Sequence, residues 1–379
     1  MRLYGLVLVT AAALCSFTAG DAYAKDKRIR FFTETNARWW IDKGGFARTS
    51  SLAARIRVPL ELIWNKRISR SIGATPSAAG DYIFIGTRDR RLFILERNSG
   101  QQMARRGFKG GFGGSVLIKG EQMFFNTQAP DGKVYSTEIN SKHKHIQRQI
   151  GPANASPILE QNQLFLFTQL GKVLSLNPDV GYRNWQQELK GKIEYAPVFL
   201  DPYLYIPTLE GTIYKLDSVT GEVIAKNNLH GHLLSDLCSD GFYIFGALTN
   251  GKVFCLEPDS LKTKWEVQLE NQFFSSPVYS EGSLFLCARA GWLVKLTAEN
   301  GNFLWKTKLN GITVSAPSLT KELAFTGTKS GEMAAFYTES GERCWYRNIN
   351  EGISASPLIY KDFLYYCTDN GSVYAFHPK

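Results

Sequence analysis

The chain has 379 residues, of which 44% are hydrophobic and 21% are charged, and its formal net charge is +10. This composition is typical of a globular protein, and the length suits one large all-β domain or two ordinary domains. Glycine (34 residues) and aromatic side chains (13%) are abundant, and no long helical periodicity follows the N-terminus, so the sequence argues against a mainly helical fold and favours many short strands.

Residues 1–24 have the pattern of a secretory signal peptide. Arg2 gives a charged start, an apolar run follows, and Ala22-Tyr23-Ala24 places small residues where a signal peptidase cleaves. The apolar run is short for a membrane span, so a retained anchor is the alternative that we favour less. We therefore expect export to the periplasm by a cleavable signal and no transmembrane segment after cleavage.

Cys15 raises the alternative of a lipoprotein. Lipid attachment needs small residues just before the cysteine, whereas Leu14 precedes it. We therefore do not expect a lipid anchor on Cys15.

A basic, aromatic lead-in covers residues 25–59 and contains Arg38-Trp39-Trp40. Between Lys25 and Arg70 there are twelve lysines or arginines against four acidic residues. The excess continues just beyond this segment, in Arg88, Arg90, Arg91, Arg105 and Arg106. These five arginines are our candidates for partner binding, and a basic surface favours an acidic protein, anionic lipid headgroups or an anionic glycan as the partner. The alternative is a solvated basic face that serves only solubility.

From residue 60 onward the sequence repeats. One unit, residues 275–310, contains four short apolar runs separated by turn residues such as Glu281-Gly282 and Asn300-Gly301, which is the pattern of an antiparallel meander. Its first-strand position recurs eight times at a nearly constant interval: Pro76, Val116, Pro157, Pro197, Leu237, Pro277, Pro317 and Pro357. Four strands in each unit, repeated eight times at this interval, predict an all-β, eight-bladed β-propeller over residues 60–379.

The two ends of the repeat predict how the ring closes. The last unit starts at Pro357 and stops at Lys379, so it lacks a fourth strand. Residues 62–68, around Trp64, resemble the fourth strand around Trp305. We therefore expect this N-terminal strand to complete the last four-stranded antiparallel blade, which removes two open sheet edges and gives a monomeric ring.

Tryptophans recur in the fourth strands and are expected to fill the gaps between blades, because a buried indole removes about 150–250 Å² from water. They are Trp64, Trp185, Trp265, Trp305 and Trp345. Five cysteines remain after signal removal, an odd number whose spacing matches no zinc or CxxC motif. We expect free, buried thiols rather than a disulfide framework.

The segment Gly211–Glu222, which runs glycine, short strand, Leu-Asp and then Thr-Gly, resembles the signature of pyrroloquinoline-quinone (PQQ) repeats, and residues 337–345 repeat its second half. The resemblance covers about residues 38–379. It implies a PQQ-like eight-bladed propeller, and the family has two relevant branches. Quinoprotein alcohol dehydrogenases are much longer and bind PQQ with Ca²⁺, whereas the BamB branch of the outer-membrane assembly machinery is close to this size and has no cofactor. In size and regularity this chain is more similar to the BamB branch.

The resemblance also directs attention to the central channel, which the residues leading into the first strands would line. Three residues before each aligned position, only Asn154 and Glu194 could be strong Ca²⁺ ligands, and they are our weak candidates for cofactor binding. The vicinal disulfide of the quinoproteins is absent, since no two cysteines are adjacent. The pairs His143/His145 and His230/His232 have no acidic or cysteine partner nearby in sequence. We therefore expect no catalytic residues, no metal and no cofactor, with PQQ and calcium as the alternative.

Irregularity in blades one and two marks the expected interaction surface. Blade one carries Asp89-Arg90-Arg91 where the turn glycine is usual, and Lys109–Gly114 and the longer hairpin Gln128–Gly132 belong to blade two. The alternative is drift in a loop that tolerates insertion. We expect a non-catalytic envelope scaffold similar to the BamB branch, with an envelope protein as partner and no nucleic acid. A small PQQ-binding quinoprotein and a binder of anionic glycans or surfaces remain the alternatives.

Overall fold

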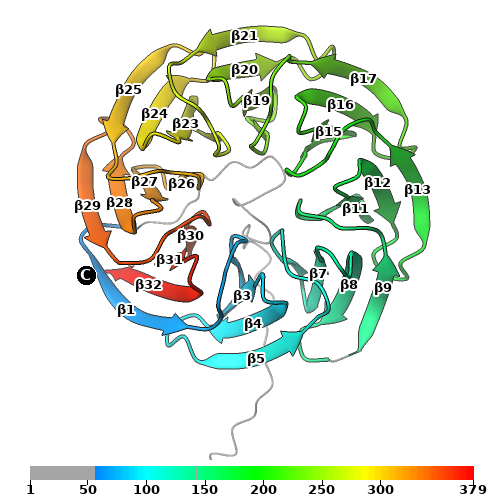
Figure 1. The fold of residues 1–379 in the computed structure, drawn as a ribbon, viewed down its shortest axis with the longest axis horizontal. Helices are drawn as coiled ribbons and strands as arrows, with labels where there is room; N and C mark the ends of the chain where they lie inside the picture. The colour runs from blue at the N-terminus through cyan, green and yellow to red at the C-terminus, as the bar shows by residue number, and fades with distance from the viewer. Residues whose placement is uncertain (1–55, 142) are drawn as a thin grey trace, which may run out of the picture.

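The computed structural model describes residues 56–141 and 143–379, which form a closed ring of eight four-stranded antiparallel sheets around a central channel (Figure 1). The expectation of an all-β, eight-bladed propeller is therefore confirmed. The predicted signal peptide and most of the lead-in, residues 1–55, lie outside the described residues. Within the described part of the chain, no helix is long and apolar enough to cross a bilayer.

Each blade runs outward from the channel through four strands (Figure 1). The innermost strands of blades one to eight are β2 (Ser77–Ala79), β6 (Leu117–Lys119), β10 (Ile158–Glu160), β14 (Val198–Leu200), β18 (Cys238–Ser239), β22 (Val278–Ser280), β26 (Ser318–Leu319) and β30 (Leu358–Tyr360). The second strands are β3 (Tyr82–Gly86), β7 (Gln122–Asn126), β11 (Gln163–Phe167), β15 (Tyr203–Pro207), β19 (Ile244–Ala247), β23 (Ser283–Ala288), β27 (Leu323–Gly327) and β31 (Phe363–Cys367).

The two outer strands of each blade are longer than the innermost one. The third strands are β4 (Arg91–Glu96), β8 (Lys133–Glu138), β12 (Lys172–Leu176), β16 (Thr212–Asp217), β20 (Lys252–Leu256), β24 (Trp292–Thr297), β28 (Glu332–Tyr337) and β32 (Ser372–Pro378). The outermost strands are β5 (Gln102–Gly107), β9 (Lys144–Gln149), β13 (Arg183–Glu188), β17 (Val223–Asn228), β21 (Thr263–Gln268), β25 (Phe303–Lys308), β29 (Arg343–Asn348) and β1 (Leu60–Arg67).

The ring closes as the truncated last repeat predicts. β1 pairs antiparallel with β32, so that Leu60 lies opposite Pro378 and Arg67 lies opposite Ser372, and the pair completes blade eight. A register shift between Leu62 and Trp64 accommodates one extra residue. Because this pairing joins strands from the two ends of the chain, it removes the open edges that an unclosed array would expose.

Antiparallel order gives the ring two different faces. The loops between second and third strands and the segments that connect successive blades lie on one face, which we call the connector face. The turns between first and second strands and between third and fourth strands lie on the other, which we call the hairpin face. At the inner end of the connector face, one residue of each loop between second and third strands donates its main-chain N–H to the adjacent connector, as Gln128 does to Gly111 (2.8 Å) and Lys329 to Ile312 (2.8 Å). The connectors that line the channel are therefore fixed by main-chain hydrogen bonds.

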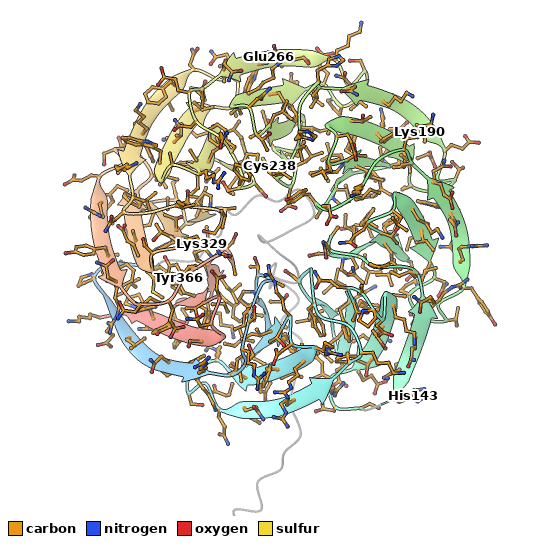
Figure 2. The ribbon with its side chains drawn as sticks, in the orientation of Figure 1. His143, Lys190, Cys238, Glu266, Lys329 and Tyr366 are labelled. Carbon is orange, nitrogen blue, oxygen red and sulfur yellow. The ribbon has the colours of Figure 1, made fainter. Side chains whose placement is uncertain are left out.

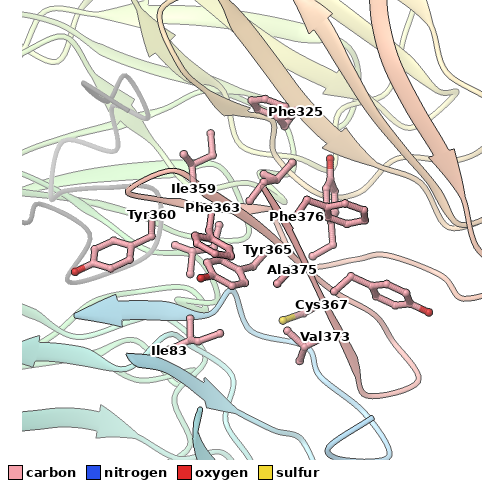
Figure 3. Packing of buried hydrophobic residues seen from close by; sticks show 14 of the residues in the cluster. Ile83, Phe325, Ile359, Tyr360, Phe363, Tyr365, Cys367, Val373, Ala375 and Phe376 are labelled. Carbon is pink, nitrogen blue, oxygen red and sulfur yellow. The ribbon is translucent and has the colours of Figure 1, made fainter. Parts of the chain in front are cut away.

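Apolar side chains between neighbouring blades form the core. Figure 3 shows the cluster of blades seven, eight and one, where Phe325, Tyr365 and Ile83 belong to three different blades and are fully buried. Each fully buried aliphatic or aromatic side chain of this kind contributes about 1.5–3 kcal/mol. The four residues of unit six that we expect in the core, Val278, Phe285, Leu286 and Val294, are also buried.

The fourth-strand tryptophans pack against the next blade. The indole rings of Trp64, Trp185, Trp265 and Trp305 lie so close to a turn glycine of the following blade that a Cβ atom there would come within 2.8 Å of the ring. The four glycines, Gly100, Gly221, Gly301 and Gly341, have φ between 66° and 77°. The glycine is therefore needed for its backbone conformation and for the space that the indole occupies.

Three blades have a small or aliphatic residue in place of this tryptophan. Register places Ala104, Ile146 and Ala225 at the equivalent position in blades one, two and four. In each of these blades the residue two positions later donates a side-chain hydrogen bond to a turn carbonyl of the next blade: Arg106 to Glu138 (3.1 Å), Arg148 to Gly181 (3.1 Å) and Asn227 to Leu261 (2.8 Å). A polar contact thus replaces or supplements apolar packing at these three interfaces.

The five cysteines of the described chain are free thiols, and four of them are buried. Burial raises the pKa of Cys367 to about 12. Burial is also the largest effect on Cys255, whose pKa is raised to about 12. Neither thiol ionises near neutral pH, so both side chains act as small apolar groups.

Candidate functional site: the channel mouth

The connectors enclose a cavity of about 280 Å³ at the centre of the ring, and we call its opening on the connector face the channel mouth. All eight positions that the sequence places three residues before the first strands line this cavity: Gly73, Gly113, Asn154, Glu194, Leu234, Phe274, Val314 and Ser354. The repeat therefore delivers one side chain per blade to the cavity, and the residue types differ around the ring.

Small polar residues form a belt inside the cavity. The main-chain N–H of Ser115 donates to the hydroxyl of Ser156 in the next blade (2.9 Å), and the N–H of Ala316 donates in the same way to Ser356 (3.2 Å). Asp236 takes this role in blade five: its carboxylate accepts from the N–H of Ala196 (2.8 Å), and its own N–H donates to Ser276 (2.9 Å). The recurring small residues of the sequence thus join neighbouring blades around the channel.

Amide side chains and one carboxylate line the part of the mouth formed by blades two to four. Gln128 donates from Nε2 to Oδ1 of Asn154 (2.6 Å), and Asn154 donates from Nδ2 to Oε2 of Glu194. Gln169 donates to the same carboxylate oxygen (3.3 Å). The structure therefore brings the two cofactor candidates, Asn154 and Glu194, into one hydrogen-bonded chain, which we call the amide sector.

This arrangement fits poorly with a calcium–PQQ site. The carbonyl oxygen of Asn154 and one oxygen of Glu194 already accept hydrogen bonds from neighbouring amides. Ca²⁺ takes six to eight oxygen ligands, several of them carboxylates, and the amide sector supplies one carboxylate. In residues 56–141 and 143–379 no three His, Cys, Asp or Glu side chains form a group that could hold a metal ion. Of the histidine pairs, His145 contacts Glu138 (3.2 Å) and His232 contacts the carbonyl of Leu209 (3.3 Å).

Cationic side chains stand around the mouth on blades six, seven and one. The Arg88 side chain crosses Gly73 so closely that a Cβ there would lie 2.1 Å from Nε. The guanidinium of Arg289 lies 4.9 Å from the ring centroid of Phe274. Lys329, on the inner side of the ring in Figure 2, donates to Ser354 and forms an ion pair with Asp369 (2.8 Å). Arg88, Arg289 and Lys329 form what we call the cationic sector.

On blades five to seven the side chains three residues before the first strands are apolar, namely Leu234, Phe274 and Val314, and this apolar sector shares blades six and seven with the cationic sector. The mouth therefore has an amide sector, a cationic sector and an apolar sector.

The five arginines predicted to bind a partner lie in three different places. Arg88, Arg90 and Arg91 lie on or beside the loop between β3 and β4 on the connector face, and all three are exposed. Arg90 has φ of 68° at the position where other repeats have glycine, and Arg91 lies 3.8 Å from Asp89. Arg105 lies on β5 at the outer wall of the ring, away from the mouth.

The side chain of Arg106 lies at the interface between blades one and two. Its guanidinium donates to the carbonyls of Glu138 and Ile139 and to the hydroxyl of Thr137, and burial lowers its pKa. These contacts join blade one to blade two, so the residue is committed to an interface between blades.

The irregular segment before blade two has a packing explanation. A Cβ on Gly110 would lie 2.4 Å from the carbonyl oxygen of Gln128, and one on Gly111 would lie 2.7 Å from that of Arg88. The longer hairpin and the neighbouring loop therefore press against this connector, and only glycine leaves room for them. Beneath it, Phe108, Phe112, Phe125 and Tyr135 form an aromatic cluster with ring centroids 5.0–5.6 Å apart.

Three residues of the mouth, Gln169, Arg289 and Lys329, were not anticipated from the sequence, and Gln128 was expected only as part of the longer hairpin of blade two. A signal for them exists, because they follow Arg88 at the same nearly constant interval as the repeat itself. These residues belong to the loops between second and third strands.

Comparison with known proteins adds the family context. A family model described as outer membrane protein assembly factor BamB matches residues 60–206 and 209–379. Outer membrane protein assembly factor BamB of Burkholderia pseudomallei is 25% identical over 111 residues, which is 29% of this chain and 29% of that protein. The aligned region thus spans less than a third of that relative's length.

Solved structures share the fold at low sequence identity. BamB from Moraxella catarrhalis has a TM-score of 0.72 at 16% identity, covering 85% of this chain and 98% of that one. Quinohemoprotein alcohol dehydrogenase from Comamonas testosteroni has a TM-score of 0.77 at 12% identity, covering 90% and 81%. Because an assembly factor and an enzyme both match, these likenesses show the ring and do not distinguish the two functions.

Proposed function

The chain belongs to the family of outer membrane protein assembly factor BamB, and from this premise we propose that it is a non-catalytic scaffold of the cell envelope that acts in outer-membrane protein assembly. The observation that carries the proposal is the extent of the family match, which covers residues 60–206 and 209–379 and so includes strands of every blade. A rigid ring that presents its loops on two faces is well suited to holding partner proteins in place.

The proposal includes export and a periplasmic location. Its support is the signal-like pattern of residues 1–24, with its apolar run and Ala22-Tyr23-Ala24. It also includes a monomeric ring, since the β1–β32 pairing leaves no blade with a missing strand for a second copy to supply.

We further propose that the scaffold works without a resident cofactor. The support is the donor set of the mouth, where the two candidate ligands, Asn154 and Glu194, are hydrogen-bonded to each other and to glutamine amides, and the carboxylate of Asp236 accepts hydrogen bonds from Ala196 and Ser276. A quinone-dependent absorbance change on adding PQQ with Ca²⁺ to the purified chain would contradict this part of the proposal.

The test of the assembly role is removal of the gene from the source organism. The expected result is a loss of folded β-barrel proteins from the outer membrane, measured by their compact gel mobility before heating and restored by a plasmid copy. An outer membrane with unchanged amounts of folded barrels, under conditions in which the protein is normally made, would contradict the proposal.

A further inference from the structure

We propose that the channel mouth is a binding site for an acidic peptide segment, whose carboxylate side chains lie against the cationic sector and whose backbone lies against the amide sector. This inference rests on the proposed scaffold function and specifies the kind of partner segment that the connector face takes. The lining of the cavity, the partners of its charged groups and its size carry the argument.

The cationic sector has positive charge that the ring does not neutralise. In the described part of the chain neither Arg88 nor Arg289 forms an ion pair, and only Lys329 has a carboxylate partner, Asp369. Both arginines are exposed and stand at corresponding loop positions of their blades; Arg88 lines the cavity, and Arg289 lies over the ring of Phe274, which lines it as well. A guanidinium binds a carboxylate through two parallel N–H···O hydrogen bonds, so these two side chains favour an anionic ligand.

The carboxylates of the cavity wall lie on blades four and five, outside the cationic sector, and their oxygens accept hydrogen bonds from neighbouring groups of the ring. Glu194 accepts hydrogen bonds from Asn154 and Gln169. Asp236 accepts from the N–H of Ala196 and from the hydroxyl of Ser276 (2.9 Å). Both groups are held as hydrogen-bond acceptors within the interfaces between blades.

The amide sector is suited to a peptide backbone. Primary amides such as Gln128 and Gln169 carry both donors and acceptors, which match the alternating C=O and N–H groups of an extended chain. Opposite them, Leu234, Phe274 and Val314 offer an apolar surface for a hydrophobic side chain next to the acidic one. A channel mouth lined only by cations would bind any polyanion. The combination of cationic, amide and apolar sectors favours an acidic peptide that also contains apolar residues.

The cavity limits how much of the segment enters. Its volume of about 280 Å³ is at the lower end of ligand pockets, which are about 300–1,000 Å³. One or two side chains therefore fill it, while the rest of the segment lies across the connector face.

Fluorescence anisotropy with the purified mature chain tests the proposal. The probe is a fluorescein-labelled decapeptide with glutamates alternating with phenylalanines, and the matched peptide has lysines in place of the glutamates. The expected result is saturable binding of the acidic peptide alone. Arg88→Gln and Arg289→Gln should each weaken binding about five-fold or more, since each removes a charge-assisted contact. Arg105→Gln, on the outer wall, is the control and should leave binding unchanged.

Three outcomes would overturn the site: no binding of the acidic peptide at millimolar concentration, equal binding of the lysine peptide, or equal loss with Arg105→Gln. Full displacement of the peptide by a sulfated polysaccharide at equal charge concentration would show a general anion site and would also reject the peptide. Thermal unfolding of each variant establishes that it is folded. Because the gene-removal experiment does not use this peptide, it can succeed while the channel-mouth proposal fails, and the reverse also holds.

Discussion

The indole Nε1 of Trp64 donates a hydrogen bond to the main-chain carbonyl of Arg97, 2.9 Å away, and so joins the strand that closes blade eight to the turn of blade one. The same bond recurs from Trp185 to Ser218 and from Trp265 to Ala298, with the same separation along the chain. Trp305 has the same packing, yet in the described structure its buried Nε1 has no hydrogen-bond partner. The fourth-strand tryptophan therefore occurs in this ring both with and without a hydrogen bond from its indole N–H.

This contrast allows the hydrogen bond to be measured. Trp64→Phe should lower the free energy of unfolding by about 1 kcal/mol more than Trp305→Phe, because only the first change removes a hydrogen bond, and the carbonyl of Arg97 then keeps only the longer bond from the hydroxyl of Tyr365 (3.2 Å). Urea unfolding followed by circular dichroism measures both. Trp64→Ala should cost about 3–5 kcal/mol, as expected for loss of a large packed side chain. Equal costs for the two phenylalanine variants would show that the indole N–H contributes nothing to ring closure.

Glycine substitutions test whether the indole needs the space beside it. Gly221 has φ of 77°, and a Cβ there would lie 2.5 Å from the ring of Trp185. Gly120 also has a positive φ, 58°, but no atom lies within 4 Å of its Cβ position. Gly120→Ala should cost about 1 kcal/mol of backbone strain, and Gly221→Ala should cost at least about 2 kcal/mol more. Thermal unfolding of the pair gives the comparison, and matching midpoints would refute the steric explanation.

Arg105 and Arg106 are adjacent in sequence and different in role. Arg106→Met should lower the free energy of unfolding by about 1–3 kcal/mol, because the carbonyl of Glu138 loses a charged donor. Arg105→Met changes an exposed side chain on the outer wall and should stay within about 0.5 kcal/mol of the unmodified protein. Chemical unfolding curves for the two variants decide the point. If the Arg105 variant were the less stable one, the assignment of Arg106 to the blade interface would be wrong.

The end of the ring contains a pair that responds to pH. Nε2 of His377 lies 2.9 Å from Oδ2 of Asp362, and this hydrogen bond raises the pKa of His377 above its ordinary value of 6.5. Partial burial is the largest single effect and raises the pKa of Asp362, but the hydrogen bond with His377, a main-chain hydrogen bond and the positive charges of His377 and Arg97 together outweigh it, and the net pKa lies below 3.8. Arg97, 3.4 Å from Asp362, and the nearby Glu61 are the other charged neighbours.

The directions of these two pKa shifts determine how the stability of the protein depends on pH. The raised histidine pKa contributes stability that is complete below about pH 6.5 and is lost as pH rises through the folded-state value. The lowered aspartate pKa contributes stability that is present above about pH 3.8 and is lost as pH falls through its folded-state value. The urea concentration at the unfolding midpoint should therefore decrease as the pH is raised from about 5.5 to about 8.5. The midpoint of His377→Gln should decrease less over the same interval. Identical pH profiles for the two proteins would exclude the pair as their cause.

The regular interval of the repeat, together with the missing last strand, was sufficient to predict eight blades, the closing strand around Trp64 and the buried positions of unit six. These features depend on local alternation and on repetition, both of which are visible in a linear sequence. The same interval predicts that Asn154 and Glu194 reach the cavity, since position within a repeat fixes position in a ring. The partner-binding role of the five arginines stays a prediction, and their charge alone does not place them in space.

Tertiary structure alone decided which neighbours each side chain meets. Arg105 and Arg106 look alike in sequence, but alternation on β5 exposes one and directs the other to carbonyls of blade two. Arg88, Arg289 and Lys329 come from distant parts of the sequence and share the mouth because the ring closes. The sequence by itself therefore determined the repeat, the fold and the family resemblance, because packing imposes them on every unit. The mixed lining of the channel mouth emerged only when eight unlike residues were brought around one axis.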